Sequence, residues 1–378
     1  MKTFSSKSFL IFLVFYLINS SLIANINQEP IKNNFVLYES DKQNIKRKVY
    51  IENNRIYFLI NNLIINTLPV LNEKFRLIHN GDETSFAFIK FQFRGKADKS
   101  KFEFIVFDKF FAITFNKSFS LHYEEPLPKI LLLNESSFVF FYPSSGILKI
   151  FESGSESEYK LSGFSSGEIN FAQERLGHIK IFKSKIFIFL SQIEKDNSLI
   201  SELFILDEES KSIKTFQLPL SHIHNVFDYN SRLLFSCYQT EPFFETGFYE
   251  ILFSENNFSQ VKLVKISDIL VENQIKNFPR YFYSSKCVFE LRQNSLHKIS
   301  ACLEKENIID AIYFEQTFYF LTRSDLNINF YSISHDLQFL NKEIFENIPY
   351  LASLLLTKNN LYLYTDTQII PLKNFTEE

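Results

Sequence analysis

Short runs of alternating apolar and polar residues follow one another along the chain, and long helical periods are nearly absent. Small groups of Asn, Ser, Lys, Glu and Asp separate these runs. An apolar period of two residues is typical of half-buried β-strands, and the polar groups are typical of turns. The pattern therefore predicts an all-β protein.

One local pattern, a polar turn followed by a strand of the form apolar-x-apolar-apolar, recurs eight times. The first apolar residues of the eight copies are Ile56, Phe102, Phe138, Ile186, Leu233, Cys287, Phe318 and Leu361. Their mean spacing is about 44 residues, and a strand repeat of this length is typical of a β-propeller with four strands per blade. We therefore predict a β-propeller of about eight four-stranded blades, with these residues in the second strand of each blade.

The clearest predicted blade has strands at 221–228, 232–238, 248–254 and 258–266. In the blade before it, strands two to four lie at 185–191, 201–206 and 212–218.

Two features leave alternatives open. The interval from Cys287 to Phe318 is short for a complete blade, so seven blades is an alternative to eight, and a pair of β-sandwiches would share the turn-and-strand pattern. The chain ends soon after a strand at 367–372, which leaves the last blade short. A strand at Asn34 to Ser40 would supply its missing outer strand and close the ring.

The composition changes this picture little. The chain of 378 residues has 46 Phe, 8 Gly and no Trp. The Trp-Asp dipeptide of WD40 blades and the Gly-Gly pair of Kelch blades are both absent, and we recognise no specific family. The formal net charge is −3 without a clear basic face, so we expect no nucleic-acid partner.

The N-terminus has the pattern of a secretory signal. Lys2 and Lys7 precede an apolar stretch at 9–18, and Ala24 is a suitable residue for the end of a signal peptide. We predict a signal peptide at 1–24, a single propeller domain at 25–378 and a secreted or lumenal location. In the alternative, an uncleaved helix at 9–26 tethers the propeller to a membrane.

The cysteines suggest one disulfide. A two-residue turn at Asn294-Ser295 would place Cys287 directly opposite Cys302 on neighbouring strands, within reach of a bond in an oxidising compartment. The alternatives are two reduced, buried thiols or a bond that involves Cys237.

Four sequons become usable if the chain enters the secretory route. They begin at Asn116, Asn134, Asn257 and Asn374. Asn134 lies at a predicted turn and is the best placed of the four.

Candidate binding residues are few. His222 and His224 flank Ile223 on a predicted inner strand, so both rings could share one face of the strand and line the central channel. A third ligand is not evident from the spacing, so we predict no metal site and no cofactor. Phe243 and Phe244 lie in a predicted loop, where exposed aromatic rings can anchor a partner.

The sequence predicts no catalytic residues. A G-x-S-x-G match at 163–167 lacks the buried strand that a nucleophile elbow requires in front of it. We therefore expect a binding module with an unknown protein or glycan partner. The alternative is an extracellular hydrolase or lyase on the same scaffold, with residues scattered over several inner strands.

Overall fold

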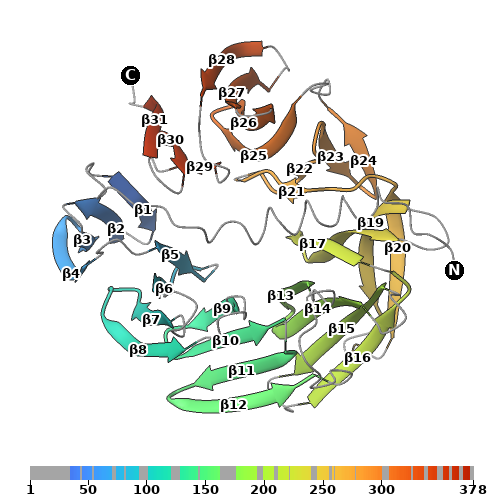
Figure 1. Ribbon diagram of the computed structural model, residues 1–378, viewed down its shortest axis with the longest axis horizontal. Coiled ribbons are helices and arrows are strands. Elements are labelled where there is room, and N and C mark those ends of the chain that lie inside the picture. Colours follow the sequence, from blue (N-terminus) through green and yellow to red (C-terminus); the bar gives the residue numbers. More distant parts are fainter. Residues whose placement is uncertain are drawn as a thin grey trace, which may run out of the picture.

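Eight small antiparallel sheets form a ring in the computed structural model of the chain (Figure 1). The structure describes the residues from Phe35 to Asn374 with internal gaps. Outside the described residues lie 1–34, 43–44, 53–54, 70–73, 81, 93–100, 121–127, 144, 162–175, 194–198, 208–211, 221, 240–244, 255–257, 259, 277, 300–305, 325–326, 336–338, 347–351, 357–359, 366–368 and 375–378.

Within the described residues, seven sheets have four strands and the eighth has three. Blades 1 to 4 consist of β1 (Phe35–Lys42), β2 (Ile45–Glu52), β3 (Arg55–Ile60), β4 (Leu63–Pro69); β5 (Lys74–His79), β6 (Ser85–Gln92), β7 (Lys101–Asp108), β8 (Ile113–Ser120); β9 (Lys129–Asn134), β10 (Ser137–Tyr142), β11 (Ile147–Glu152), β12 (Ser155–Lys160); and β13 (Leu176–Phe182), β14 (Lys185–Ile193), β15 (Leu199–Asp207), β16 (Ser212–Leu218). Blades 5 to 8 consist of β17 (His222–Tyr229), β18 (Arg232–Gln239), β19 (Glu245–Phe253), β20 (Val261–Ser267); β21 (Asn273–Gln274), β22 (Tyr281–Tyr283), β23 (Val288–Arg292), β24 (Ser295–Lys298); β25 (Asn307–Phe314), β26 (Thr317–Ser324), β27 (Asn327–Ser334), β28 (Phe339–Phe345); and β29 (Ala352–Leu356), β30 (Asn360–Thr365), β31 (Ile369–Asn374).

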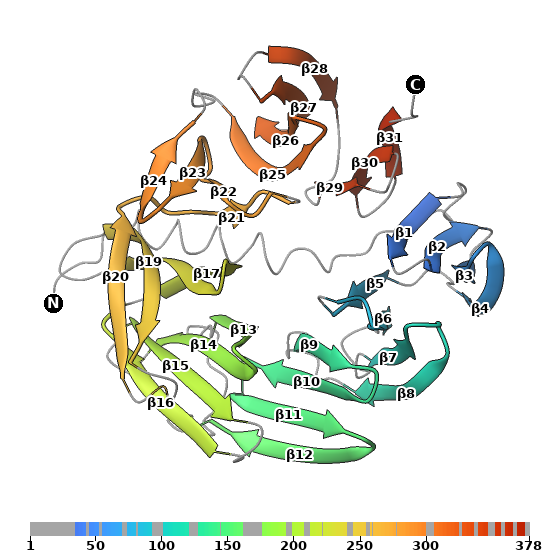
Figure 2. The same ribbon diagram turned by 180° about the vertical axis from the view of Figure 1, so that it is seen from behind.

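The predicted all-β propeller with eight blades is confirmed. The seven-bladed and β-sandwich alternatives are wrong, because eight separate sheets follow one another around a common centre (Figures 1 and 2). No helix among the described residues has the length and apolar character needed to cross a membrane.

Three of the eight repeated signals lie at third strands rather than second strands. Ile56 is in β3, Phe102 is in β7 and Cys287 directly precedes β23. The step from a third strand to the next second strand is shorter than a whole blade, which explains the short interval from Cys287 to Phe318. The sequence could not separate the two positions because both middle strands of a blade are buried on both faces and can follow a polar turn.

The core lies between the blades rather than at the centre of the ring. Seven apolar clusters each join two consecutive blades, from blades 1 and 2 to blades 7 and 8. Phenylalanine dominates several of them: Phe58 stacks near Phe107 at 4.6 Å, and Phe104 lies 4.8 Å from Phe138, measured between ring centroids. The many Phe residues therefore serve packing between sheets.

The junction between blade 8 and blade 1 is different. Within the described residues, no apolar cluster joins these two blades. Phe35 to Ser40, the described part of the segment predicted to close the ring, belongs to β1 and pairs with β2. The prediction that it completes the last blade is wrong, because the apolar residues of this strand pack into blades 1 and 2 instead.

Several hairpin turns use residues other than glycine in the left-handed region. Both residues of the Lys183-Ser184, Asn230-Ser231 and Glu315-Gln316 turns have a positive φ. Turns of this shape match the twist of the strands that they join. The chain thus builds hairpins with only 8 glycines.

Candidate functional site

The first strands of the blades lie nearest the centre of the ring, and the last strands, such as β4, β12 and β20, lie at its rim (Figures 1 and 2). The first strands therefore surround the centre of the ring, and we call their inner faces the channel wall. β17 departs from regular pairing there: its register with β18 shifts between Ile223 and Asn225, so that His224 is the extra residue of a β-bulge.

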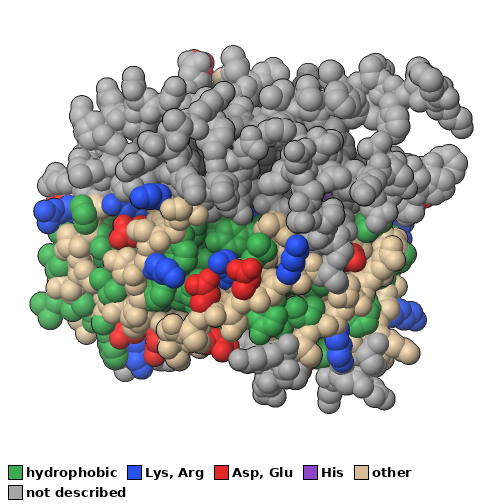
Figure 3. Space-filling model, turned by 60° about the horizontal axis from the view of Figure 1, so that its bottom comes forward, with side chains coloured by type: hydrophobic (Ala, Val, Ile, Leu, Met, Phe, Trp, Pro, Cys, Tyr) green, Lys and Arg blue, Asp and Glu red, His purple; other side chains and the backbone are tan. Residues whose placement is uncertain are grey.

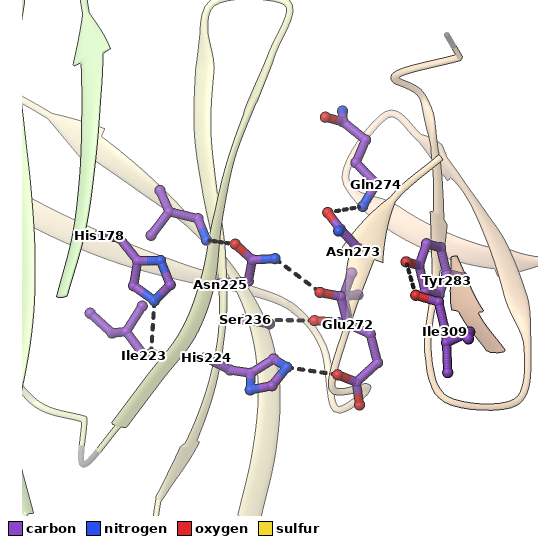
Figure 4. Close-up of polar contacts among 12 residues, drawn as sticks. His178, Ile223, His224, Asn225, Ser236, Glu272, Asn273, Gln274, Tyr283 and Ile309 are labelled. Atoms are coloured by element: carbon purple, nitrogen blue, oxygen red, sulfur yellow. Dashed lines mark hydrogen bonds and ion pairs between the residues drawn. The ribbon is translucent and has the colours of Figure 1, made fainter. Parts of the chain in front are cut away.

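The bulge brings His224 to the next blade. Its Nε2 lies 2.7 Å from Oε2 of Glu272, which directly precedes β21 (Figure 4). Asn225 donates from Nδ2 to the main-chain oxygen of the same glutamate at 2.9 Å. Both side chains of the His224–Glu272 pair are partly exposed. The pair is thus held between blades 5 and 6 and remains open to solvent.

His178 of β13 lies on the other side of β17. Its Nε2 donates to the main-chain oxygen of Ile223 at 3.3 Å (Figure 4). Burial, assisted by the nearby Lys129 ammonium, lowers the pKa of His178 to about 4. The ring is therefore neutral at neutral pH, with Nδ1 as an acceptor.

His222 has a different environment from His224. Its side chain is buried, and its ring centroid lies 4.4 Å from that of Tyr238. Burial, with smaller contributions from His224 and His178, lowers the pKa of His222 to about 3. The structure thus places His222 in the packing of blade 5, and only His224 of the predicted pair contacts a carboxylate.

Three cations line the channel wall on blades 2 to 4. Arg76 lies on β5, Lys129 on β9 and Lys180 on β13, each on the first strand of its blade. Within the described part of the chain, none of the three makes a hydrogen bond or an ion pair. The carboxylate of Asp228 on β17 acts electrostatically on Lys180.

The pKa values reflect this crowding. Burial, and then the Arg76 guanidinium, lower the pKa of Lys129. Burial also lowers the pKa of Lys180, while Asp228 opposes this effect. Lys129 is nevertheless exposed to solvent. Titratable groups with perturbed pKa values are typical of functional sites.

The other predicted site residues are only partly covered by the structure. Phe243, Phe244 and the G-x-S-x-G segment at 163–167 lie outside the described residues. Among the residues described, no three His, Cys, Asp or Glu side chains are grouped so that they could hold a metal ion.

The cysteine hairpin differs from its prediction. Leu291 pairs with Leu296 and Phe289 with Lys298, so the turn is Gln293-Asn294 and the predicted register is wrong by two residues. Cys237 is a free, buried thiol, which excludes the alternative bond through it. Cys302 lies outside the described residues, so the Cys287–Cys302 disulfide stays a prediction.

Two sequon asparagines can be placed with their side chains. Asn116 is exposed on the outer strand β8, and Asn134 is exposed at the end of β9, where its Oδ1 accepts from the main-chain N–H of Ser136 at 2.9 Å. Asn374 ends β31, and Asn257 lies outside the described residues.

Sequence reasoning missed Glu272 and the three channel cations. A weak signal was present, because Lys180 interrupts the apolar residues of a predicted inner strand. Charged side chains are uncommon at such buried positions, so this lysine pointed to a possible functional role. Their convergence could not be seen, because it joins residues from different blades.

No protein-family profile and no curated protein matches the chain. Solved structures with a similar fold include the acylaminoacyl peptidase of Pyrococcus horikoshii, with 9% identity and a TM-score of 0.44 over 77% of this chain and 51% of that one. The chain thus spans about half the length of this peptidase. The propeller domain of the Trilobed protease from Pyrococcus furiosus, described as having an open velcro topology, is 12% identical over 78% of this chain and 92% of that one, with a TM-score of 0.43. Kluyvelomyces marxianus Hsv2 is 8% identical over 79% of this chain and 96% of that one, with a TM-score of 0.44. These similarities concern the β-propeller fold alone.

Proposed function

We propose that this protein is a secreted or lumenal β-propeller that acts as a binding module, with its ligand at the channel wall of blades 2 to 6. The observation that carries the proposal is the partly exposed His224–Glu272 pair. It sits on a bulged inner strand, between two blades, and its groups are oriented by Asn225 and the main chain of Glu272. A polar group so fixed at a concave surface is suited to orient a ligand.

The secretory part of the proposal rests on the signal-like residues 1–24 and the sequons. Exposure of Asn116 and Asn134 is compatible with modification at these positions. Phe243 and Phe244 remain candidate contacts for a protein partner. Because the predicted partner is a protein or a glycan, the test includes both classes of ligand.

The test uses the full chain secreted from a eukaryotic host. Sequencing should give a mature N-terminus near Asn25, and an intact Met1 in a membrane fraction would instead establish the tethered form. The secreted protein is then applied to glycan and peptide arrays beside Glu272→Gln and the matched exposed control Glu315→Gln. We expect Glu272→Gln to weaken the strongest interaction about tenfold, with the control unchanged.

Equal binding by both variants would contradict a channel site. A hydrolase is the second candidate, because an imidazole that contacts a carboxylate has the arrangement of an oriented general base. Turnover of an array substrate by the wild type, lost in Glu272→Gln, would favour this candidate over a binding module.

A further inference from the structure

We infer that Arg76, Lys129 and Lys180 bind an anionic group of the ligand, a carboxylate, sulfate or phosphate, on the channel wall of blades 2 to 4. The inference rests on the proposed function, because it assigns a ligand chemistry to the same channel. It identifies a subsite of its own, on different blades from the His224–Glu272 pair.

The three cations come from three consecutive first strands, β5, β9 and β13. These strands follow one another around the centre of the ring, and β9 contacts both β13 and strand β6 of blade 2 (Figure 1). Although 53 positions separate Arg76 from Lys129 and 51 separate Lys129 from Lys180, Arg76 acts electrostatically on Lys129, and Lys129 and Lys180 both act on His178. Like charges gather there in a chain whose formal net charge is −3.

Internal partners do not explain the cluster. In the described part of the chain, the side chains of Arg76, Lys129 and Lys180 make no hydrogen bond or ion pair. Some lysines farther from the centre do have partners: Lys149 of β11 contacts Glu156 at 2.9 Å, and Lys265 of β20 contacts Asp268 at 2.5 Å. Figure 3 shows such mixed basic and acidic side chains on the rim of the ring.

Electrostatics make the cluster unfavourable without a ligand. Partial burial removes water from Lys129, and the Arg76 guanidinium repels its ammonium, so the pKa of Lys129 falls. Asp228 compensates only in part, because it acts on Lys180 from blade 5. Three cations and one carboxylate leave an excess of two positive charges, which a bound anion would neutralise.

The side chains suit such a ligand. A guanidinium can donate two parallel hydrogen bonds to a carboxylate, sulfate or phosphate, and lysines add flexible point charges. His178, on which Lys129, Lys180 and His224 all act, is neutral and contributes no repulsion of its own. Glu272 repels an anion on the far side, which confines the subsite to blades 2 to 4.

The experiment titrates the full secreted chain with sodium sulfate, inorganic phosphate and citrate at neutral pH, with sodium chloride added to hold the ionic strength constant. Calorimetry gives affinity, and thermal unfolding gives the midpoint. Lys129→Gln is compared with Lys262→Gln, an exposed lysine on the outer strand β20 that makes no contact in the described residues.

We expect at least one anion to raise the unfolding midpoint beyond the chloride control. Lys129→Gln should bind it about tenfold more weakly, equivalent to about 1.4 kcal/mol. Without anion, Lys129→Gln should unfold at an equal or slightly higher temperature, because it relieves repulsion. If Lys129 only stabilised the fold, Lys129→Gln would instead unfold at a lower temperature than the wild type without anion.

The inference is overturned if sulfate, phosphate and citrate act like chloride, or if both lysine variants respond alike. Partner binding that depends on Glu272 but not on Lys129 would keep the proposed function and remove the anion subsite. Anion binding lost in Lys129→Gln, with no array ligand sensitive to Glu272, would keep the subsite and contradict the proposed site at blades 5 and 6. Free inorganic anion alone, without any charged array ligand, would assign the subsite to a small ion.

Discussion

Asn225 and Asp310 occupy the same structural position in blades 5 and 7. Each follows a β-bulge in the first strand of its blade, and each accepts from the main-chain N–H of the following residue at 2.9 Å. Asn225 then donates to the main-chain oxygen of Glu272 in blade 6, whereas Asp310 accepts from the main-chain N–H of Leu354 in blade 8 at 2.7 Å. The bulges thus turn polar side chains into links between blades.

Asp310 should be important for stability. Its buried carboxylate also contacts the Lys276 ammonium of blade 6, so one side chain connects three blades. Asp310→Ala leaves the Leu354 N–H and Lys276 without this partner and should lower the free energy of unfolding by about 2–4 kcal/mol. Chemical denaturation measures the loss, and exposed Asp41→Ala should stay within about 0.5 kcal/mol of wild type. Equal effects of the two variants would show that the link contributes nothing.

β4 should be the edge strand most prone to self-association. The other seven outermost strands each carry a lysine, a common protection of edge strands, whereas β4 has no charged residue. Leu63, Ile64 and Ile65 are 69%, 56% and 47% exposed. Ile64→Lys should therefore reduce self-association at high concentration, measured by light scattering, without lowering the unfolding midpoint. Ile64→Leu is the matched control, and unchanged scattering in the lysine variant would contradict the expectation.

Acid should destabilise the fold through two histidines. Burial lowers the pKa of His178 to about 4 and that of His222 to about 3. In the unfolded chain both histidines have a pKa of about 6.5, so below this pH they are protonated in the unfolded state but not in the folded state. The stability is complete above pH 6.5 and falls as the pH drops towards these folded values, by at most about 1.4 kcal/mol per pH unit for each histidine.

His222→Phe should flatten this pH dependence, because it removes one titrating ring and keeps an aromatic contact with Tyr238. Denaturation at pH 7, 5.5 and 4.5 measures the slope. Exposed His297→Gln on β24 should leave it unchanged. A slope that persists fully in His222→Phe would assign the acid sensitivity to other groups.

Cys237 should be unreactive in the folded protein, since burial raises the pKa of its thiol to about 12. Iodoacetamide labelling with mass spectrometry should give no adduct at Cys237 in native protein and full labelling after unfolding. If the predicted Cys287–Cys302 bond exists, unfolded protein without reductant takes up one label, and reduction raises this to three. Three labels before reduction would contradict the disulfide.

Asn134 should carry a glycan when the chain passes through the secretory route, because it is exposed at a turn. Asn134→Gln should remove the mass of one glycan, and Asn66→Gln, outside any sequon, should remove none. Identical masses for wild type and Asn134→Gln would show that the sequon is unused.

The sequence by itself predicted most of the strands and a count of about eight blades, and the structure decided between eight and seven. The alternating residues of β2 and the apolar runs of β14 and β15 are local patterns, and local patterns dictate strand formation. At Ile56, Phe102 and Cys287 the repeated pattern marks the third strand of a blade instead of the second. The number of blades is unaffected, because each blade still contributes one copy of the pattern.

Only the tertiary structure decided which side chains meet. The bulge that extends His224 to Glu272 depends on pairing between β17 and β18, and the convergence of Arg76, Lys129 and Lys180 depends on the placement of three separate blades. The tertiary structure also decided that β1 belongs to the first blade. The apolar residues of β1 pack within blades 1 and 2, and β1 pairs with β2 instead of completing the sheet at the C-terminal end of the chain. Strand formation follows from neighbours in sequence, whereas a site on a propeller is made by residues about one blade apart, whose spacing carries no signature.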